Sequence, residues 1–429
     1  MDVPPLVASA LLSAAALGAI TAWLCVYLRV ARDYRAHRID ARAPELPEPP
    51  AWPAVSIIVP ARNEAENIIP CLETLLAQEY PPAAPQPSAS RSPRQGGAAP
   101  QLEIIVVDDG STDATADRAR TRMGGPLPLA VVRGEEPPPG WMGKQAACMR
   151  GAAGARGAWL LFVDADARLH PQALRRGLAL CAARRLSLLS FSPRQRCASF
   201  WEHLVQSLVY RFLNVRYSYT KVNDPASRQA AAHGAFLLIE RRAFEEVGGF
   251  APARHTTIDD AVLAQTVKEA GFAIGFAPTL DLVAVRMYAG ARALWKGWPK
   301  TAFAFLGERA GALLGYSLLM IATHLLPSLL LAAFMAQLLS GGARLVSLGP
   351  AALPPFLALA AFLFSLGCDV RLRRREGFAA WPALLNPLGA LCWLALFWQA
   401  ALRRWLGCPA VWRGRRYPAA SQPDSQSRA

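Results

Sequence analysis

Apolar residues gather at the two ends of the chain, and a mixed polar and apolar pattern fills its middle. Residues 4–28 carry no charged side chain, and such a stretch is long enough to cross a bilayer as a helix. The chain becomes strongly apolar again in its last third, with candidate spans at 311–339, 348–369 and 381–402. This pattern predicts a domain carried between membrane segments.

The first apolar segment is predicted to be a membrane helix and not a signal peptide. A signal peptide begins with basic residues and has a shorter apolar core, whereas this chain begins Met1-Asp2. Arginines follow the segment after Val30, and by the positive-inside rule they place the following domain in the cytoplasm.

The C-terminal apolar region leaves two alternatives open. The span at 311–339 contains Pro327, so it is either one tilted helix or a hairpin. The basic tail after Leu402 also favours the cytoplasm, which conflicts with three simple crossings. A re-entrant or interfacial segment around Pro382 and Pro387 would resolve that conflict.

Short, continuous apolar runs alternate with helical patterns in the middle of the chain, as in sheets of parallel strands buried on both faces. This alternation predicts an α/β fold with a doubly wound sheet. The predicted strands are Val55–Val59, Ile104–Val107 and Trp159–Val163, and the predicted helices are Glu64–Gln78, Asp113–Met123 and Lys144–Gly154.

The expected organisation has six parts. They are an N-terminal transmembrane helix (1–30), a Pro-rich linker (31–54), a catalytic domain (55–290) with a disordered low-complexity loop at 81–100, an interfacial amphipathic segment (291–309), a transmembrane region (310–405) and a basic cytoplasmic tail (406–429).

The charge and the cysteine spacing limit the classes of partner that the chain is expected to bind. The formal net charge is +15, and many arginines lie beside apolar segments, a placement that favours anionic lipid headgroups over nucleic acid. Residues 196–222 mix aromatic and basic side chains; base stacking is an alternative there, but an amphipathic helix at a membrane or acceptor groove is favoured. The cysteines show no zinc-ligand spacing and are expected to be reduced.

Acidic pairs follow two of the predicted strands. Asp108 and Asp109 end the second strand, and Asp164 and Asp166 follow the third. In an open α/β sheet, ligands bind beyond the carboxyl ends of the strands. Residues two apart on an extended chain project to the same face, so Asp164 and Asp166 are candidates to hold one hard cation such as Mg²⁺ or Mn²⁺.

Two further segments have both a structural and a chemical interpretation. Lys144, after two glycines, either opens a helix or contacts phosphate or ribose. Asp260 either forms a capping box with Thr257 or acts as a general base, with Asp259 as an electrostatic neighbour.

The order of these motifs resembles glycosyltransferase family 2 over residues 52–305. The motifs are P-A-R-N-E at 60–64, V-V-D-D-G-S-T-D at 106–113, G-W-M-G-K at 140–144, D-A-D at 164–166, H-G-A-F-L-L-I-E at 233–240 and I-D-D at 258–260. S-F-W-E-H-L at 199–204, R-M-Y at 286–288 and W-K-G-W-P-K at 295–300 are similar to bacterial membrane enzymes with lipid acceptors, including hopanoid-associated and carotenoid-type glycosyltransferases.

The resemblance implies a GT-A fold, a nucleotide-sugar donor (commonly a UDP-sugar), Mg or Mn, and inversion by direct displacement. It places Pro60, Arg62 and Glu64 at the nucleotide, Asp109 at the base, Asp164 and Asp166 as the D-x-D pair with Asp166 on the metal, and Asp260 as the catalytic base beside Asp259. From their own positions, Asp108 and Lys144 are further candidates to bind the nucleotide sugar. The acceptor region would comprise His233, Gly234, Arg286, Trp295, Trp298 and Lys300.

The chain departs from the family pattern at two points. His233 stands where many relatives have Asn, and the Q-x-x-R-W motif of processive synthases is missing. We therefore expect transfer of a sugar to a lipid or lipid-linked acceptor, with a processive polysaccharide synthase as the alternative and an inactive membrane scaffold as a remote one.

Overall fold

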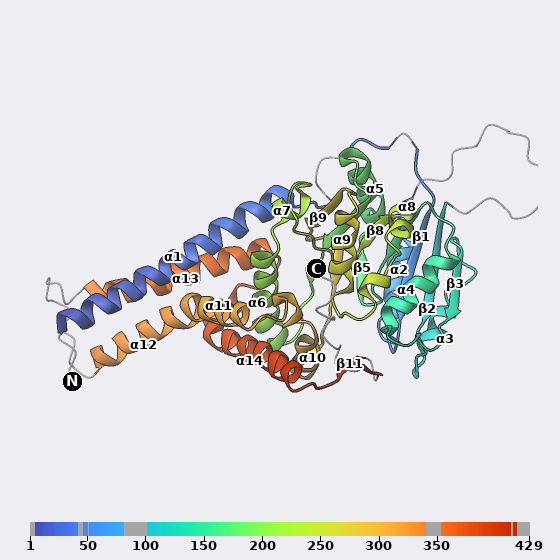
Figure 1. Ribbon diagram of the computed structural model, residues 1–429. Helices are drawn as coiled ribbons and strands as arrows, with labels where there is room; N and C mark the ends of the chain where they lie inside the picture. Colours follow the sequence, from blue (N-terminus) through green and yellow to red (C-terminus); the bar gives the residue numbers. More distant parts are fainter. Residues whose placement is uncertain are drawn as a thin grey trace, which may run out of the picture. The chain divides into compact units, whose positions relative to one another are not determined.

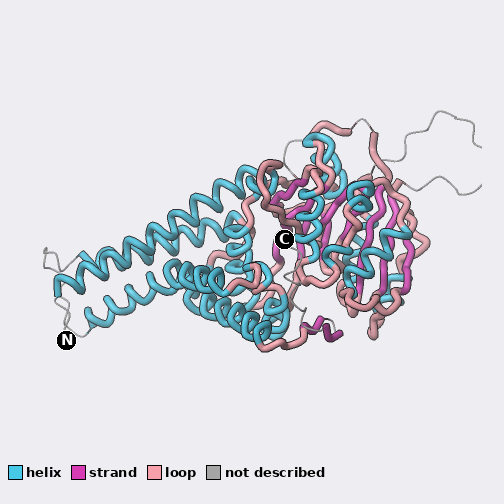
Figure 2. Tube along the Cα trace, in the orientation of Figure 1, coloured by secondary structure: helices cyan, strands magenta, loops and turns pink. Residues whose placement is uncertain are grey.

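The structure is a computed structural model that describes residues 5–41, 46–49, 51–80, 101–339, 353–412 and 415–417. The chain divides into two compact units. One contains Met1–Arg35, Cys197–Arg216 and Tyr288–Cys408, and is called the helical unit; the other contains Ala36–Arg196, Tyr217–Met287 and Pro409–Ala429, and is called the sheet unit. The predicted loop at 81–100 lies outside the described residues. The strands of the described residues all belong to the sheet unit, which also contains helices (Figure 2).

A seven-stranded sheet forms the centre of the sheet unit, in the order β3-β2-β1-β4-β8-β6-β9. The first four of these strands are parallel, whereas β8 runs antiparallel to both β4 and β6. The three predicted strands correspond to β1, β2 and β4, and the reversal at β8 was not predicted. The strands are β1 (Val55–Ala61), β2 (Leu102–Asp108), β3 (Leu129–Arg133), β4 (Trp159–Phe162), β6 (Leu188–Ser192), β8 (Leu237–Glu240) and β9 (Ile274–Pro278).

Helices cover both faces of this sheet (Figure 1). Alternating residues of β2 explain this: Ile104 and Val106 join the main core with α2 and α5, while Ile105 and Val107 pack with Ala147 of α4. The helices are α2 (Ile68–Leu76), α3 (Thr115–Arg120), α4 (Gly143–Gly154), α5 (Ala173–Arg184), α7 (Tyr219–Asn223), α8 (Arg241–Glu246), η1 (Ala251–Ala253) and α9 (Asp259–Glu269).

Two smaller sheets complete the sheet unit. The strands β5 (Ala167–Leu169), β10 (Val283–Val285) and β7 (Arg194–Gln195) form one of them. The other is a C-terminal hairpin of β11 (Ala410–Trp412) and β12 (Arg415–Tyr417). Residues from the expected linker are also tied to this unit, because the N–H of Ile39 donates to the carbonyl of Pro278 over 3.0 Å.

All secondary-structure elements assigned in the described part of the helical unit are helices. They are α1 (Pro5–His37), α6 (Phe200–Arg216), α10 (Gly290–Gly297), η2 (Trp298–Lys300), η3 (Ala304–Leu306), α11 (Ala310–Met320), η4 (Ile321–Leu325), α12 (Leu326–Leu339), α13 (Leu353–Arg375), η6 (Trp381–Leu385) and α14 (Asn386–Trp405). Four stretches are long and apolar enough to cross a membrane: Val7–His37, Ala310–Ala336, Pro354–Arg375 and Trp381–Trp405.

The predicted span containing Pro327 is one helix and not a hairpin. A π-helical turn, η4, joins α11 to α12 immediately before this proline. Proline has no backbone N–H and crowds the preceding turn, and a wider π turn is one way in which a helix accommodates that disruption.

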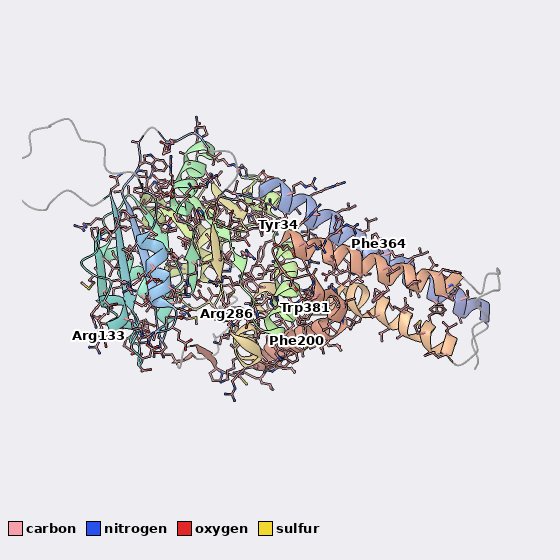
Figure 3. The ribbon with its side chains drawn as sticks, turned by 180° about the vertical axis from the view of Figure 1, so that it is seen from behind. Tyr34, Arg133, Phe200, Arg286, Phe364 and Trp381 are labelled. Carbon is pink, nitrogen blue, oxygen red and sulfur yellow. The ribbon has the colours of Figure 1, made fainter. Side chains whose placement is uncertain are left out.

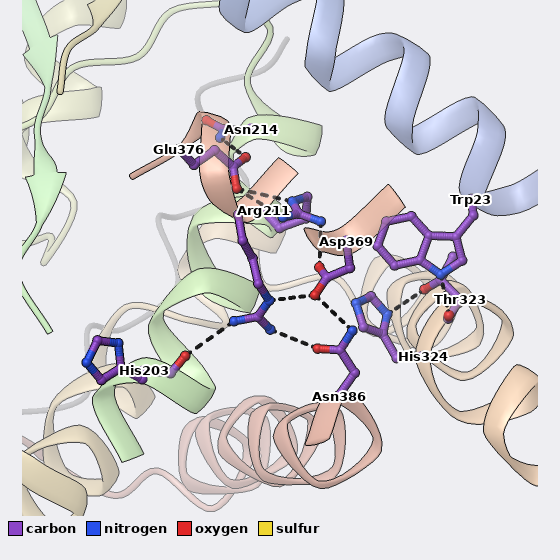
Figure 4. Close-up of polar contacts among 10 residues, drawn as sticks. Trp23, His203, Arg211, Asn214, Thr323, His324, Asp369, Glu376 and Asn386 are labelled. Atoms are coloured by element: carbon purple, nitrogen blue, oxygen red, sulfur yellow. Dashed lines mark hydrogen bonds and ion pairs between the residues drawn. The ribbon is translucent and has the colours of Figure 1, made fainter. Parts of the chain in front are cut away.

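Buried charges join α6 to α13 inside the helical unit (Figure 4). Arg211 lies 3.0 Å from carboxylate oxygens of both Asp369 and Glu376. Arg373 pairs with the second oxygen of Asp369 and donates to Asn386 over 2.8 Å. Two guanidinium groups and two carboxylates therefore balance in charge, which is the condition under which buried ions are tolerated.

Exposed aromatic side chains also mark the helical unit. Phe200 at the start of α6 and Trp381 at the start of η6 lie side by side with ring centres 5.7 Å apart (Figure 3). Both rings are more than one-third exposed, and aromatic rings of this kind are enriched at membrane–water interfaces.

Candidate active site

The polar motifs lie at one edge of the sheet because the strands that precede them are parallel and in register. Ala61, the last residue of β1, pairs with Asp108, the last residue of β2. On the other side, β4 pairs with β1 up to Phe162, two residues before Asp164. The loops after these strands therefore meet at the carboxyl edge, where open α/β sheets bind ligands.

The loops after β1 and β2 hold each other in place. Asn63 has φ +53°, an uncommon conformation that its short polar side chain tolerates, and its N–H donates to Ser111 Oγ over 3.0 Å. The N–H of Glu64 donates to Thr115 Oγ1 over 2.8 Å. Arg62 donates to the carbonyl of Asp109. The helices predicted to start at Glu64 and Asp113 begin later because these residues form the loops.

Pro60, Glu64 and Asp108 lie at this same edge. Pro60 pairs with Val107, one position before the end of the pairing of β1 with β2. Glu64 accepts a hydrogen bond from Asn67 Nδ2 over 2.8 Å, and Asp108 accepts one from the N–H of Ser111 over 3.1 Å. Both carboxylates are buried, and these contacts fix the shape of the loops.

Asp109 is buried and paired with an arginine that sequence reasoning missed. Arg415 Nη1, from the C-terminal hairpin, lies 2.6 Å from Asp109 Oδ2, and the two side chains are 14% and 4% exposed. Burial raises the pKa of Asp109, while the hydrogen bond from Arg415 acts in the opposite direction. The sequence signals Arg415 only as one of many basic tail residues.

Lys144, at the start of α4, lies among three carboxylates. Its Nζ is 2.9 Å from Asp164 Oδ1 and 3.5 Å from Asp259 Oδ2. These charges, with Asp260, raise the pKa of Lys144 against the effect of burial, so the ammonium form is strongly favoured. Lys144 therefore opens α4 and is also an ion-pair partner of Asp164 and Asp259.

Gly234 closes the opposite side of this cluster. A Cβ at this position would lie 2.7 Å from Lys144 Nζ and 2.8 Å from Asp164 Oδ2. Its N–H donates to Asp260 Oδ2 over 2.9 Å, and its carbonyl accepts from the N–H of Asp164 over 3.1 Å. Only glycine fits here without displacing charged groups.

Asp259 and Asp260 open α9. The residue before the helix, Ile258, makes no side-chain cap. Asp260 accepts hydrogen bonds from the backbone N–H groups of Gly234, over 2.9 Å, and Ala261, over 2.8 Å. Burial raises the pKa of Asp259 to about 6 and also raises that of Asp260, whereas Lys144 lowers both.

His233 is a neutral imidazole beside these charges. Its Nδ1 accepts a hydrogen bond from the N–H of Ala235 over 3.1 Å, which leaves the proton on Nε2. Burial lowers its pKa to about 4, with Asp164 acting against this and Lys144 adding to it. Its position therefore suits a hydrogen-bonding role and not a cationic one.

A small pocket brings several of these residues together. Its lining includes Pro60, Lys144, Asp164, Gly234, Asp259 and Asp260. The carboxylate of Asp109 lies at the start of α4, because a Cβ at Gly143 would come directly against it.

The donor set at Asp164 and Asp166 suits a hard cation. Both carboxylates are partly exposed and flank the buried Ala165. Among the described residues, no three His, Cys, Asp or Glu side chains are arranged around a common metal position. Magnesium is typically held by one or two carboxylates together with substrate phosphates, so two carboxylates fit the implied ion.

The expected acceptor residues separate between the units. Arg286, labelled in Figure 3, is exposed directly after β10 in the sheet unit, whereas Trp295, Trp298 and Lys300 belong to the helical unit. Trp295 is 45% exposed, but Trp298 is 2% exposed, and its indole N–H donates to Gln206 Oε1 over 2.9 Å. The side chain of Trp298 therefore belongs to the core, and we no longer assign it to acceptor contact.

Two family models match the chain. The Glycosyl transferase family 2 model matches residues 56–248, and the Glycosyl transferase family group 2 model matches residues 159–398, more than half of the chain. The chain is 26% identical over 373 residues to 4,4'-diaponeurosporenoate glycosyltransferase of Staphylococcus aureus, covering 85% of this chain and 88% of that protein.

Two more distant proteins are also similar. Glycosyltransferase AglE of Haloferax volcanii is 26% identical over 225 residues, covering 52% of this chain and 64% of that protein. The solved mannosyltransferase PcManGT from Pyrobaculum calidifontis, in complex with GDP-Man and Mn²⁺, has a TM-score of 0.50 at 20% identity, covering 93% of this chain and 98% of that one. It shares the GT-A fold. By its motifs, fold and family match, the chain belongs to glycosyltransferase family 2.

Proposed function

We propose that this protein is a metal-dependent, inverting glycosyltransferase. It moves a sugar from a nucleoside-diphosphate donor to a lipid or lipid-linked acceptor at the cytoplasmic face of the inner membrane. We favour a UDP-sugar as the donor. The observation that carries the proposal is the cluster of Lys144, Asp164, Asp259 and Asp260 around Gly234 in one pocket. An isolated acidic pair would not favour this chemistry over a structural role.

The donor binds across the carboxyl edge of the sheet in this proposal. The loops that carry Pro60, Arg62 and Glu64 form one wall, and Asp108 and Asp109 form the other. Asp109 accepts a hydrogen bond from the base, and Lys144 holds the donor phosphate or ribose beside Asp164. The cation, held by Asp166 with Asp164, would neutralise charge on the departing diphosphate.

Asp260 is the general base. The backbone N–H groups of Gly234 and Ala261 hold its carboxylate in one orientation. The acceptor hydroxyl gives its proton to Asp260 as its oxygen bonds to the anomeric carbon, and the bond from that carbon to the diphosphate breaks. Burial raises the pKa of Asp260, which makes it a stronger base near neutral pH. Asp259 and Lys144 set the charge around it.

The acceptor is amphiphilic in this proposal. Four helices of the described residues are long and apolar enough to cross a membrane. The Staphylococcus aureus relative is named 4,4'-diaponeurosporenoate glycosyltransferase. We assign His233, Gly234 and Arg286 of the sheet unit to the acceptor side. Anionic lipids would bind the arginines beside the apolar segments.

A transfer assay tests the proposal. Membranes containing the full chain are incubated with labelled UDP-sugars and with GDP-mannose, with Mn²⁺ or with EDTA, and their lipids are extracted. We expect one labelled lipid product that requires Mn²⁺ or Mg²⁺. Asp117→Asn is a matched control, because Asp117 is 84% exposed and pairs only locally with Arg120 in α3. A long polymer would favour a processive synthase, and no transfer from any donor would overturn the proposal.

A further inference from the structure

Arg415 fills a position in the proposed donor pocket that is separate from the Lys144 cluster. Its Nη1 is 2.6 Å from Asp109 Oδ2. A Cβ at Gly143 would lie 2.2 Å from that same oxygen and 2.6 Å from Arg415 Nη1. The ion pair therefore packs directly against the start of α4, at the sheet edge where nucleotides bind in such folds.

The guanidinium of Arg415 offers Asp109 the same kind of hydrogen-bond donor, a planar N–H group, that a nucleobase would offer. Arginine offers planar N–H donors and no acceptor, and uracil or guanine would likewise offer ring N–H donors to a carboxylate. Because the side chain of Asp109 is 4% exposed with Arg415 in place, a base that contacts Asp109 must first displace the arginine.

The hairpin that carries Arg415 is short. It consists of the three-residue strands β11 and β12, and a two-stranded hairpin is marginally stable by itself. The second acidic contact of Arg415 is Glu136, at 3.5 Å, and the Glu136 side chain is 86% exposed, so it adds little. Asp109 in turn needs a replacement donor, because a buried carboxylate without a partner is costly.

We infer that Arg415 is an internal competitor of the donor nucleotide: it holds the hydrogen-bonding position on Asp109 until a base replaces it and the C-terminal hairpin moves away. This inference rests on the proposed function, since it takes Asp109 as the base contact. It makes Arg415 a residue that controls which nucleotides enter the pocket and at what concentration.

Binding of plain UDP and GDP to the detergent-purified full chain, measured calorimetrically with Mn²⁺, tests this inference. If the hairpin is closed in about 90% of molecules, the apparent Kd is about tenfold above the intrinsic one. We expect Arg415→Ala and Arg415→Glu to lower Kd by about that factor. Arg416→Ala, which removes the same charge from the same hairpin, should leave Kd near the wild-type value.

Limited trypsin digestion gives a second readout that needs no catalysis. Saturating UDP should increase cleavage in the C-terminal tail of the wild type, while Arg415→Ala should be cleaved rapidly with or without UDP. Weaker nucleotide binding by Arg415→Ala would show that Arg415 is a donor ligand, and unchanged Kd and cleavage would show that it does not close the pocket; either result overturns the inference.

Asp109→Asn separates failure of the inference from failure of the proposed function. If Asp109→Asn weakens UDP binding while Arg415→Ala does not strengthen it, only the inference fails. If the wild type and all variants bind neither UDP nor GDP, the proposed function fails with it.

Discussion

The backbone N–H of Gly234 donates to Oδ2 of Asp260 over 2.9 Å, so the residue between the donor and acceptor sides also orients the proposed base. The same glycine leaves no room for a side chain beside Lys144 and Asp164. The backbone of Gly234 thus lies between the charges of Lys144 and Asp164 and the proposed base, Asp260.

Gly234→Ala should therefore reduce kcat strongly while the protein still folds. The added methyl group would push apart Lys144 and Asp164, and misplacement by about 1 Å can cost about 10²-fold in rate. Gly154→Ala is the control, because a Cβ there meets nothing within 4 Å. Kinetic assays, with thermal unfolding measured in parallel, distinguish loss of catalysis from loss of folding. Equal kcat values for the two variants would contradict the role proposed for Gly234.

The sequence predicted the parallel half of the sheet because apolar runs such as Ile104–Val107 are buried on both faces. It did not predict the reversal at β8, since antiparallel pairing of Leu237–Glu240 with β4 depends on chain topology and not on local pattern. Nor did it show that α6 belongs with the membrane helices, because its charged residue Arg211 finds its partners far along the chain.

Arg415 was missed for a similar reason. It lies 306 positions from Asp109, and nothing in its local sequence separates it from the other tail arginines. The prediction for Trp298 assigned a chemical role where the structure shows packing. Its motif suggested acceptor contact, but its side chain is buried among Tyr288 and Trp393.

Activity should fall on the acid side at a higher pH than an ordinary aspartate would give. Burial disfavours the ionised forms of Asp259 and Asp260 and raises the pKa of Asp259 to about 6. The base must be ionised to accept a proton, so kcat/KM should fall as the pH decreases through that range, with the two carboxylates titrating as a pair.

Lys144→Met should move this acid limb to still higher pH, since Lys144 favours the ionised carboxylates. The measurement is kcat/KM from pH 5 to 8.5, restricted to conditions in which the protein stays folded. An acid limb near pH 4 in the wild type, or no movement in Lys144→Met, would contradict the assignment.

The C-terminus should lie on the same side of the membrane as the active site. Arg415 contacts Asp109, and three candidate spans separate them in sequence: Ala310–Ala336, Pro354–Arg375 and Trp381–Trp405. An odd number of crossings would place the two residues on opposite faces, so one candidate does not cross. We expect it to be α14, which packs on α6 and α11 through Gly389 and Trp393.

Cysteine labelling checks this topology. In a background without native cysteines, Ser427→Cys and Glu246→Cys should both be protected from a membrane-impermeant maleimide in intact cells and react after permeabilisation. Glu246 is an exposed residue of the sheet unit. Labelling of only one of the two positions from outside would show that α14 crosses the membrane.

Asp369→Asn should destabilise the helical unit. Asp369 is fully buried and pairs with both Arg211 and Arg373, and removing one partner of a buried ion pair costs about 3–5 kcal/mol. Thermal unfolding in detergent should show a clearly lower Tm than for Arg371→Gln, which removes an exposed charge from the same helix. Equal Tm values would mean that the network contributes little to stability.

The role of Asp260 as the base is tested most directly by Asp260→Asn, compared with the wild type and Asp117→Asn in both donor binding and transfer to extracted lipid. Asparagine keeps the shape of the side chain but cannot take a proton, and loss of a general base costs about 10²–10⁴-fold in rate. We predict that kcat falls by at least about 10²-fold while the Kd for the donor nucleotide stays within a few-fold of the wild type. Transfer at the wild-type rate by Asp260→Asn would contradict the account.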